Sequence, residues 1–257
     1  MMQRKDKELS PALFSLFFAV FCVILALIGA VLIFISTVLF KNTDNSAEKS
    51  YLPVSGDLPI TVIIDAGHGG EDGGAVGKDG KSEKELNLSI SETLCDMLRA
   101  CGINTVMTRT DDRLLYDRNV DYKGRKKSLD LRARLDIEKS IPNSVFVSIH
   151  MNAFPSEKES GLQVWYSKNA PGSRDLASNI QTLIKDNLQA ENKRKIKAAD
   201  SSIYLLNRAE DCAVLIECGF LSNPEECKKL SDEDYRKSLS FVICLAIREY
   251  CENNSCK

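Results

Sequence analysis

Residues 60–70 read ITVIIDAGHGG and residues 145–152 read VFVSIHMN, and these two stretches decide the fold class. Each is an apolar, β-branched run that predicts a buried strand, and each carries one of the chain's 2 histidines, His68 and His150, at its end. A single histidine is often a core or capping residue. Two histidines at strand ends indicate a metal site instead, because strand-end loops carry the sites of α/β sheets and imidazole is the commonest zinc ligand.

Further apolar runs extend this pattern along the chain. Strands are predicted at residues 60–65, 103–108, 145–149, 162–166, 203–206 and 213–217. Helices are predicted at residues 83–100, 128–140, 173–188 and 234–250. Strands that alternate with helices, and that are apolar on both faces, predict one α/β domain with an about six-stranded, mostly parallel sheet flanked by helices.

The N-terminal part has a different character. Residues 13–40 are apolar and contain no charge, and they are longer than the ~20 residues that span a bilayer. A cleaved signal peptide is the alternative, but its apolar core would be about 7–15 residues long and followed by a small-residue cleavage site. The stretch therefore predicts a single permanent transmembrane helix.

Basic residues before this stretch set its predicted orientation. Arg4, Lys5 and Lys7 keep the N-terminus in the cytoplasm and place the rest of the chain outside. The predicted organisation is a cytoplasmic tail (1–12), a transmembrane anchor (13–40), a polar linker (41–57) and a catalytic domain (58–257).

Charge and cysteine content exclude several other classes. The net charge of −2 and the absence of basic stretches interleaved with aromatic residues argue against nucleic-acid binding. The 9 cysteines include no C-x-x-C pair, which argues against a cysteine zinc site. Most of them fall at apolar positions of predicted helices and strands, and we interpret these as reduced core residues.

A glycine-rich loop follows the first histidine. Half of the chain's 14 glycines lie in residues 67–80, but Asp72 stands where phosphate-binding motifs need glycine. A catalytic zinc takes three protein ligands, so two histidines call for a third donor, most simply a carboxylate. Residues 82–85 (SEKE) form a capping box that occupies the second glutamate and leaves Glu83 to face the metal. The alternative is a surface glutamate that stabilises the helix dipole.

A second carboxylate ends another apolar strand. Residues 213–224 read AVLIECGFLSNP, and a buried Glu217 needs either a partner or a chemical task. The structural alternative is a salt bridge with Arg132 or Arg134. The functional alternative is a general base and acid. The Asn-Pro pair that follows is expected to start a helix.

At these residues the chain resembles the zinc-dependent N-acetylmuramoyl-L-alanine amidases of bacterial cell walls. The resemblance rests jointly on residues 64–70 (IDAGHGG), 83–84 (EK), 148–152 (SIHMN) and 217–224 (ECGFLSNP). It implies zinc held by His68, Glu83 and His150, with Glu217 as the catalytic carboxylate. It also implies a six-stranded α/β fold and cleavage of the amide between the lactyl group and L-alanine in peptidoglycan.

Within this family, the chain is most similar to the membrane-anchored sporulation amidases that prepare spore cortex for muramic-δ-lactam. The anchor, the absence of wall-binding repeats and residues 197–206 (KAADSSIYLL) carry that likeness. It implies peptidoglycan strands with stem peptides as the partner, and a domain between the membranes of the developing spore. An activating protein partner is left open.

Two other functions remain open at this point. A zinc peptidase that acts on the same stem peptides would use the same kinds of ligands, so ligand type does not separate the two enzymes. A non-catalytic wall-binding protein would have a degenerate site, whereas all four key residues are present here.

Overall fold

One six-stranded sheet organises the part of the chain that the computed structural model describes, residues 60–117, 119 and 122–254. The strands are β1 (Thr61–Ala66), β2 (Asn104–Met107), β3 (Ser144–Asn152), β4 (Gln163–Tyr166), β5 (Lys197–Ala198) and β6 (Cys212–Phe220). Their order in the sheet is β2-β1-β3-β6-β4-β5, and only the β4–β6 pair is antiparallel. The predicted six-stranded, mostly parallel sheet is confirmed.

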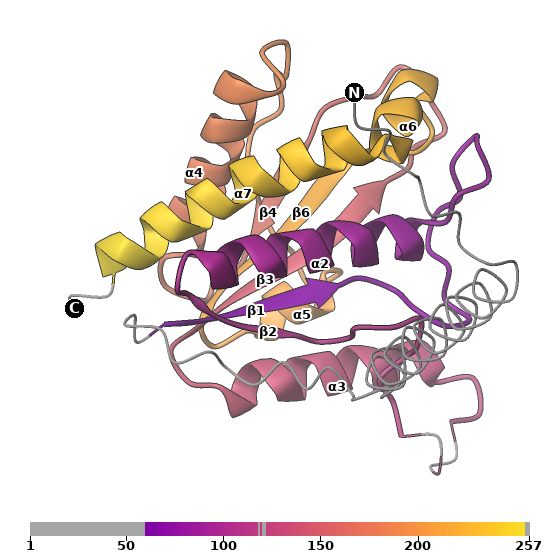
Figure 1. Cartoon of the computed structure of the whole chain (residues 1–257). Helices are drawn as coiled ribbons and strands as arrows, with labels where there is room; N and C mark the ends of the chain where they lie inside the picture. Colours follow the sequence, from indigo (N-terminus) through magenta and orange to yellow (C-terminus); the bar gives the residue numbers. More distant parts are fainter. Residues whose placement is uncertain (1–59, 118, 120–121, 255–257) are drawn as a thin grey trace, which may run out of the picture. The chain divides into compact units, whose positions relative to one another are not determined.

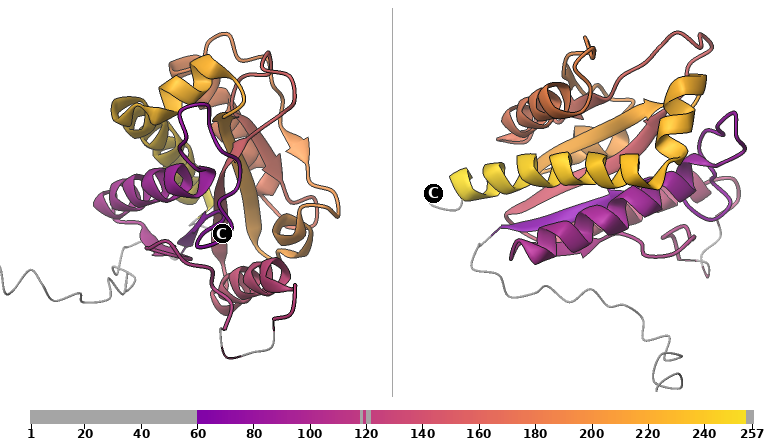
Figure 2. Two further views of the ribbon diagram at one scale, coloured as in Figure 1. Left: turned by 90° about the vertical axis from the view of Figure 1, so that its right-hand side faces the viewer. Right: turned by 45° about the horizontal axis from the view of Figure 1, so that its top comes forward.

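Helices cover both faces of this sheet (Figure 1, Figure 2). They are α2 (Glu83–Ala100), α3 (Lys126–Ser140), α4 (Ser173–Asn187), α5 (Tyr204–Arg208), α6 (Pro224–Ser231) and α7 (Glu233–Asn254). α2, α4 and α7 pack on one face, and α3 and α5 pack on the other. The described part of the chain is therefore an α/β/α sandwich, as the alternation of strands and helices predicts.

Burial on both faces of the strands follows from this layering. Val62 and Ile64 of β1 point into the core under α2, while Ile63 points into the core under α3, and all three are fully buried. On α2, buried Leu86 and Ile90 recur four residues apart and meet the same core. Packing in these two cores holds the strands in place. Because β1, β3 and β6 are parallel, their C-terminal ends lie at one edge of the sheet.

One predicted strand is wrong. Residues 203–206 (IYLL) begin the short helix α5, whose Leu205 and Leu206 are buried against the core under α3. A short apolar run fits a buried helix turn as well as a strand, so periodicity alone does not separate them. The sixth strand is instead β5, a two-residue edge strand that pairs with Trp165 and Tyr166 of β4.

Two other expectations concern the membrane and the cysteines. The predicted span at 13–40 lies outside the described residues, and among the described residues no helix is long and apolar enough to cross a bilayer. All of the described cysteines except Cys101 are buried. Buried thiols of this kind act as small apolar core residues, as predicted.

Candidate metal centre

The loop after β1 presents His68 at the edge of the sheet. His68 has a left-handed backbone (φ 61°), which is uncommon for a residue with a side chain. The surrounding structure holds this conformation, because Arg134 donates to His68 O (2.7 Å) and Gly67 N donates to Ile149 O (3.1 Å). Such local strain clusters at functional sites.

Both histidines converge on one carboxylate. His68 Nε2 lies 3.2 Å from Glu83 Oε1, and His150 Nδ1 lies 3.0 Å from the same oxygen. The ring centroids of the two histidines are 5.0 Å apart. The structure thus brings together three residues that are distant in the sequence and that come from β1's loop, α2 and β3.

The first turn of α2 places Glu83. Ser82 N donates to Glu85 Oε2 (3.1 Å), so the predicted capping box forms and Glu85 is occupied by it. Glu83 is buried, and its two carboxylate oxygens accept hydrogen bonds from Met151 N and Ala75 N (both 2.9 Å). Burial by itself raises the pKa of Glu83, but hydrogen bonds from His150 and His68 bring it well below its ordinary value. Glu83 is therefore a buried carboxylate in the cluster and not a surface residue.

Two glycines make this close packing possible. A Cβ at Gly67 would lie 2.3 Å from the His150 ring, and a Cβ at Gly74 would lie 2.4 Å from Glu83 Oε2. Gly74 also has a positive φ of 68°. The glycine loop therefore serves to let the backbone approach the cluster, a use of glycine that the sequence analysis anticipated in general terms.

Asp72 is a site residue that sequence reasoning used only to exclude phosphate. Its Oδ1 lies 3.0 Å from His68 Nδ1, the ring nitrogen that faces away from Glu83. A carboxylate behind a histidine fixes the orientation of the ring and strengthens it as a metal ligand. The spacing His68-x-x-x-Asp72 within a glycine loop was the available signal. Glu71, in contrast, forms an ion pair with Lys126 (2.6 Å).

A buried ionic network supports the loop from below. Asp65 is fully buried and accepts hydrogen bonds from Arg134 Nη1 (2.6 Å), Ser148 Oγ (2.6 Å) and Thr108 Oγ1 (2.8 Å). Arg134 also pairs with Asp130 (2.8 Å). Because these buried charges are paired, the fold tolerates them. Removal of one partner would leave an unpaired buried charge and destabilise the fold.

Arg109 completes this support on the other side of the loop. Its guanidinium donates to Ala66 O (2.8 Å), Gly67 O (2.9 Å) and Lys84 O (2.8 Å). These contacts tie the end of β1 to the start of α2. The positions of His68 and Glu83 are therefore coupled through one buried arginine that the sequence analysis did not single out.

Glu217 lies beside the cluster on β6. It is in register with His150 of the neighbouring parallel strand, and a β-bulge follows directly, between the pairs His150–Glu217 and Asn152–Phe220. Bulges of this kind re-aim side chains next to active sites. Burial raises the pKa of Glu217 to about 7; the charges of His150 and His68 oppose this rise, and the Glu83 carboxylate adds to it.

The salt bridge weighed as the alternative role of Glu217 does not form. Arg134 is committed to Asp65 and Asp130, and Arg132 is exposed. Among the described residues, Oε2 of Glu217 is buried without any hydrogen-bond partner. A buried polar atom with no partner indicates a chemical task or a missing ligand.

The cluster fits a catalytic zinc ion. Its ligand atoms, one from each of His68, Glu83 and His150, all lie within 4.8 Å of one another. Two imidazole nitrogens and one carboxylate oxygen are the donor set of a catalytic site that keeps an open position. Bonds of ~2.1 Å in a tetrahedron place ligand atoms roughly 3.4 Å apart, close to the 3.2 and 3.0 Å from the His68 and His150 nitrogens to Glu83 Oε1.

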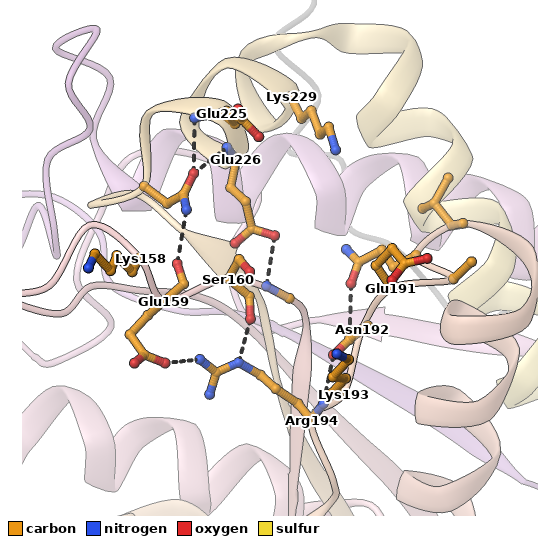
Figure 3. A pocket seen from close by; sticks show the side chains of 15 residues that line it. Lys158, Glu159, Ser160, Glu191, Asn192, Lys193, Arg194, Glu225, Glu226 and Lys229 are labelled. Atoms are coloured by element: carbon orange, nitrogen blue, oxygen red, sulfur yellow. Dashed lines mark hydrogen bonds and ion pairs between the residues drawn. The ribbon is translucent and has the colours of Figure 1, made fainter.

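A wide cleft lies elsewhere at the same end of the domain, between α6 and the segments before β4 and before β5 (Figure 3). It measures about 790 Å³, and none of the four candidate site residues lines it. Several of its charged groups already have partners, because Arg194 pairs with Glu159 and Glu226 accepts from Gly161 N (2.8 Å). Because no candidate site residue lines it, the cleft is separate from the metal centre.

Comparison with known proteins agrees with this geometry. The family model described as N-acetylmuramoyl-L-alanine amidase matches residues 62–249. The germination-specific N-acetylmuramoyl-L-alanine amidase of Bacillus subtilis is 35% identical over 221 residues, which cover 86% of this chain and 90% of that protein.

Two solved structures extend the comparison. The CwlD amidase of Clostridioides difficile, solved in complex with the GerS lipoprotein, superposes with a TM-score of 0.71 at 40% identity and covers 76% of this chain and 99% of that one. An N-acetylmuramoyl-L-alanine amidase from Clostridium difficile 630 gives a TM-score of 0.64 at 31% identity, with 76% of this chain and 98% of that one covered.

Proposed function

This chain belongs to the N-acetylmuramoyl-L-alanine amidase family, and from that premise we propose that it cleaves peptidoglycan as a zinc enzyme, with His68, Glu83 and His150 as ligands. The family establishes the amidase activity. The observation that supports the zinc assignment is the convergence of two imidazoles on the Glu83 carboxylate, with the unpartnered oxygen of Glu217 next to them. A zinc ion bound there supplies a Lewis acid that polarises a carbonyl and acidifies a water.

Glu217 performs the proton transfers in this proposal. Burial raises the pKa of this carboxyl above its ordinary value and a zinc ion beside it would lower it, so the group is suited both to accept a proton from water and to release it. Its buried Oε2 takes the proton of the attacking water and then delivers it to the leaving nitrogen of L-alanine as the carbon–nitrogen bond breaks. The products are a muramic acid with a free lactyl carboxylate and a stem peptide that begins with L-alanine.

The remaining residues hold these groups in place. Asp72 orients the His68 ring from behind, and Arg109 and Arg134 hold the carbonyls of the loop. Because these supports come from buried or partly buried groups, the cluster is preorganised before substrate binds.

Mass spectrometry of the products tests this function. Purified peptidoglycan incubated with the full-length chain and zinc is expected to release peptides with a free N-terminal L-alanine and to leave intact glycan strands. The Glu217→Gln protein serves as the matched control and is expected to release almost none. A shortened stem peptide that stays attached to the glycan would instead identify a peptidase.

A role in spore cortex maturation or germination is the finer part of the proposal. It is supported by the 35% identity to a germination-specific amidase and the 40% identity to CwlD. In such a role the domain acts outside the cytoplasmic membrane, held there by residues 13–40.

The membrane topology gives its own prediction. Arg4, Lys5 and Lys7 precede the apolar stretch, so the domain beyond residue 41 is expected outside the cytoplasm. Protease added to intact cells stripped of their wall should digest this domain and spare an N-terminal tag on the tail. A cytoplasmic marker protein controls for cell integrity. Protection of the whole domain would reverse the proposed orientation.

A further inference from the structure

A second cavity opens beside the loop that carries His68. It measures about 380 Å³ and is lined by Gly70, Glu71, Leu114, Tyr116 and Tyr122. A small hollow at the metal centre is lined by other residues of the same loop, His68 among them, and by Lys127 at the start of α3. Residues 67, 68 and 72 of this loop line the hollow at the metal centre, and residues 70 and 71 line the second cavity. The two hollows are therefore neighbours along one loop.

Two tyrosine rings in this cavity pack against each other and against a lysine. Tyr116 and Tyr122 pack edge to face, with centroids 5.8 Å apart and an interplanar angle of 62°. Lys126 Nζ lies 4.5 Å from the centroid of the Tyr122 ring, and the same lysine forms the ion pair with Glu71. Rings that already contact their neighbours before binding lose less conformational entropy when a ligand stacks on them.

Exposure and charge indicate what this cavity takes. Tyr122 is 39% exposed, one of few large side chains with apolar surface left in water. The cavity carries no unpaired charge, because Glu71 is neutralised by Lys126. An aromatic wall with one carboxylate and two phenol hydroxyls suits a neutral polyol, whose C–H groups meet the electron-rich ring face while its hydroxyls meet the polar groups.

We propose that this cavity is a glycan subsite that takes one N-acetylhexosamine ring of the peptidoglycan strand. The proposal rests on the proposed function, which places the lactyl amide at the metal centre. The alternative occupant is the stem peptide, whose several charges find no unpaired counterpart in this cavity.

The sheet order then gives the substrate a direction. The cavity lies beyond β1, on the side of β2 and α3, whereas Glu217 stands on β6. The glycan strand therefore runs over the start of α3, and the stem peptide leaves on the side of β6 and β4. Cleavage of the amide at the metal centre then releases the stem peptide on one side and leaves the glycan strand on the other.

Binding of a sugar probe tests the subsite without turnover. The probe is the β-1,4-linked trisaccharide of N-acetylglucosamine, which has no lactyl amide and is not hydrolysed. The full-length chain is kept in a detergent without a sugar headgroup, and affinity is measured by saturation-transfer NMR. Tyr122→Ala is expected to weaken trisaccharide binding about tenfold, the worth of one aromatic contact. Tyr122→Phe keeps the ring and should bind within about twofold of the parent chain.

Two controls complete the design. Phe241→Ala removes an exposed ring from α7, on the opposite face of the sheet from α3, and should leave binding unchanged. A free stem peptide beginning with L-alanine, used as a second probe, should bind the parent chain and Tyr122→Ala equally.

Other results overturn the subsite. The subsite is ruled out if the parent chain and Tyr122→Ala bind the trisaccharide equally, or if the parent chain does not bind it. If Tyr122→Ala loses affinity for the stem peptide, the cavity binds the peptide instead. Hydrolysis of peptidoglycan by the parent chain is measured in parallel. If L-alanine-terminated peptides are released, the amidase function is supported even when the subsite is ruled out. If none are released, the proposed function is wrong even when the trisaccharide binds at Tyr122.

Discussion

Alanine at His68, Glu83 or His150 is expected to remove both bound zinc and amidase activity. Each substitution leaves two of the three ligand atoms that now lie within 4.8 Å of one another, and two ligands hold the ion poorly. The loss of affinity should exceed the 10–100-fold that removal of a residue behind a ligand costs. Elemental analysis after gel filtration measures the zinc, and release of stem peptides measures the activity.

The first turn of α2 offers a matched control for this result. Glu85→Ala removes a carboxylate two residues from Glu83, and that carboxylate faces the Ser82 backbone and not the cluster. It should cost about 0.5–2 kcal/mol of stability, as the loss of a cap does, and should retain full zinc. The zinc content of Asp72→Asn should fall between those of the ligand variants and Glu85→Ala, because Asp72 lies against His68 Nδ1, the ring nitrogen that faces away from Glu83.

Full zinc occupancy in Glu83→Ala would contradict the assignment. Asp72 would then be the next candidate for the third ligand, because it already contacts His68. Glu71 would not be, because its carboxylate is paired with Lys126 on the side of the glycan cavity.

Local signals in the sequence were sufficient to predict β1, which the His68 loop follows, and β3, which carries His150 near its end. Both lie inside the sheet and carry apolar residues on both faces, so burial and periodicity agree. The capping box likewise predicted which glutamate of α2 is free, and the structure places that glutamate between the two histidines. Their convergence is observed, and their roles as ligands stay predictions.

Long-range partners were beyond the reach of the sequence. Arg132 and Arg134 were the partners considered for Glu217 in its alternative, structural role, yet Arg134 binds Asp65 and Asp130. Which carboxylate Arg134 binds depends on which strand packs against α3. The sheet order determines that strand, and no local sequence pattern reveals the order. The strand predicted at residues 203–206 was wrong for a related reason. Its apolar residues lie in the core under α3, and they could be buried there as a strand or as a helical turn.

Glu217→Gln is expected to lower turnover by roughly 10²–10⁴-fold, the usual worth of a general acid–base. Glutamine keeps the shape and the polarity of the side chain but neither accepts nor donates the catalytic proton. The protein should fold, because Oε2 of Glu217 has no hydrogen-bond partner among the described residues and no ion pair is broken. Turnover is measured by release of L-alanine-terminated peptides.

The zinc content of the same variant separates proton transfer from metal binding. Glu217→Gln should keep zinc at the level of the parent chain, because this residue stands beside the cluster on β6 and supplies none of its three ligand atoms. Ligand variants lose metal and activity together, whereas this variant loses activity alone. Near-normal turnover in a folded, zinc-loaded Glu217→Gln protein would defeat the mechanism and leave the buried, unpartnered carboxylate without a task. A combined loss of zinc would instead make Glu217 part of the metal site, which its register beside His150 does not by itself require.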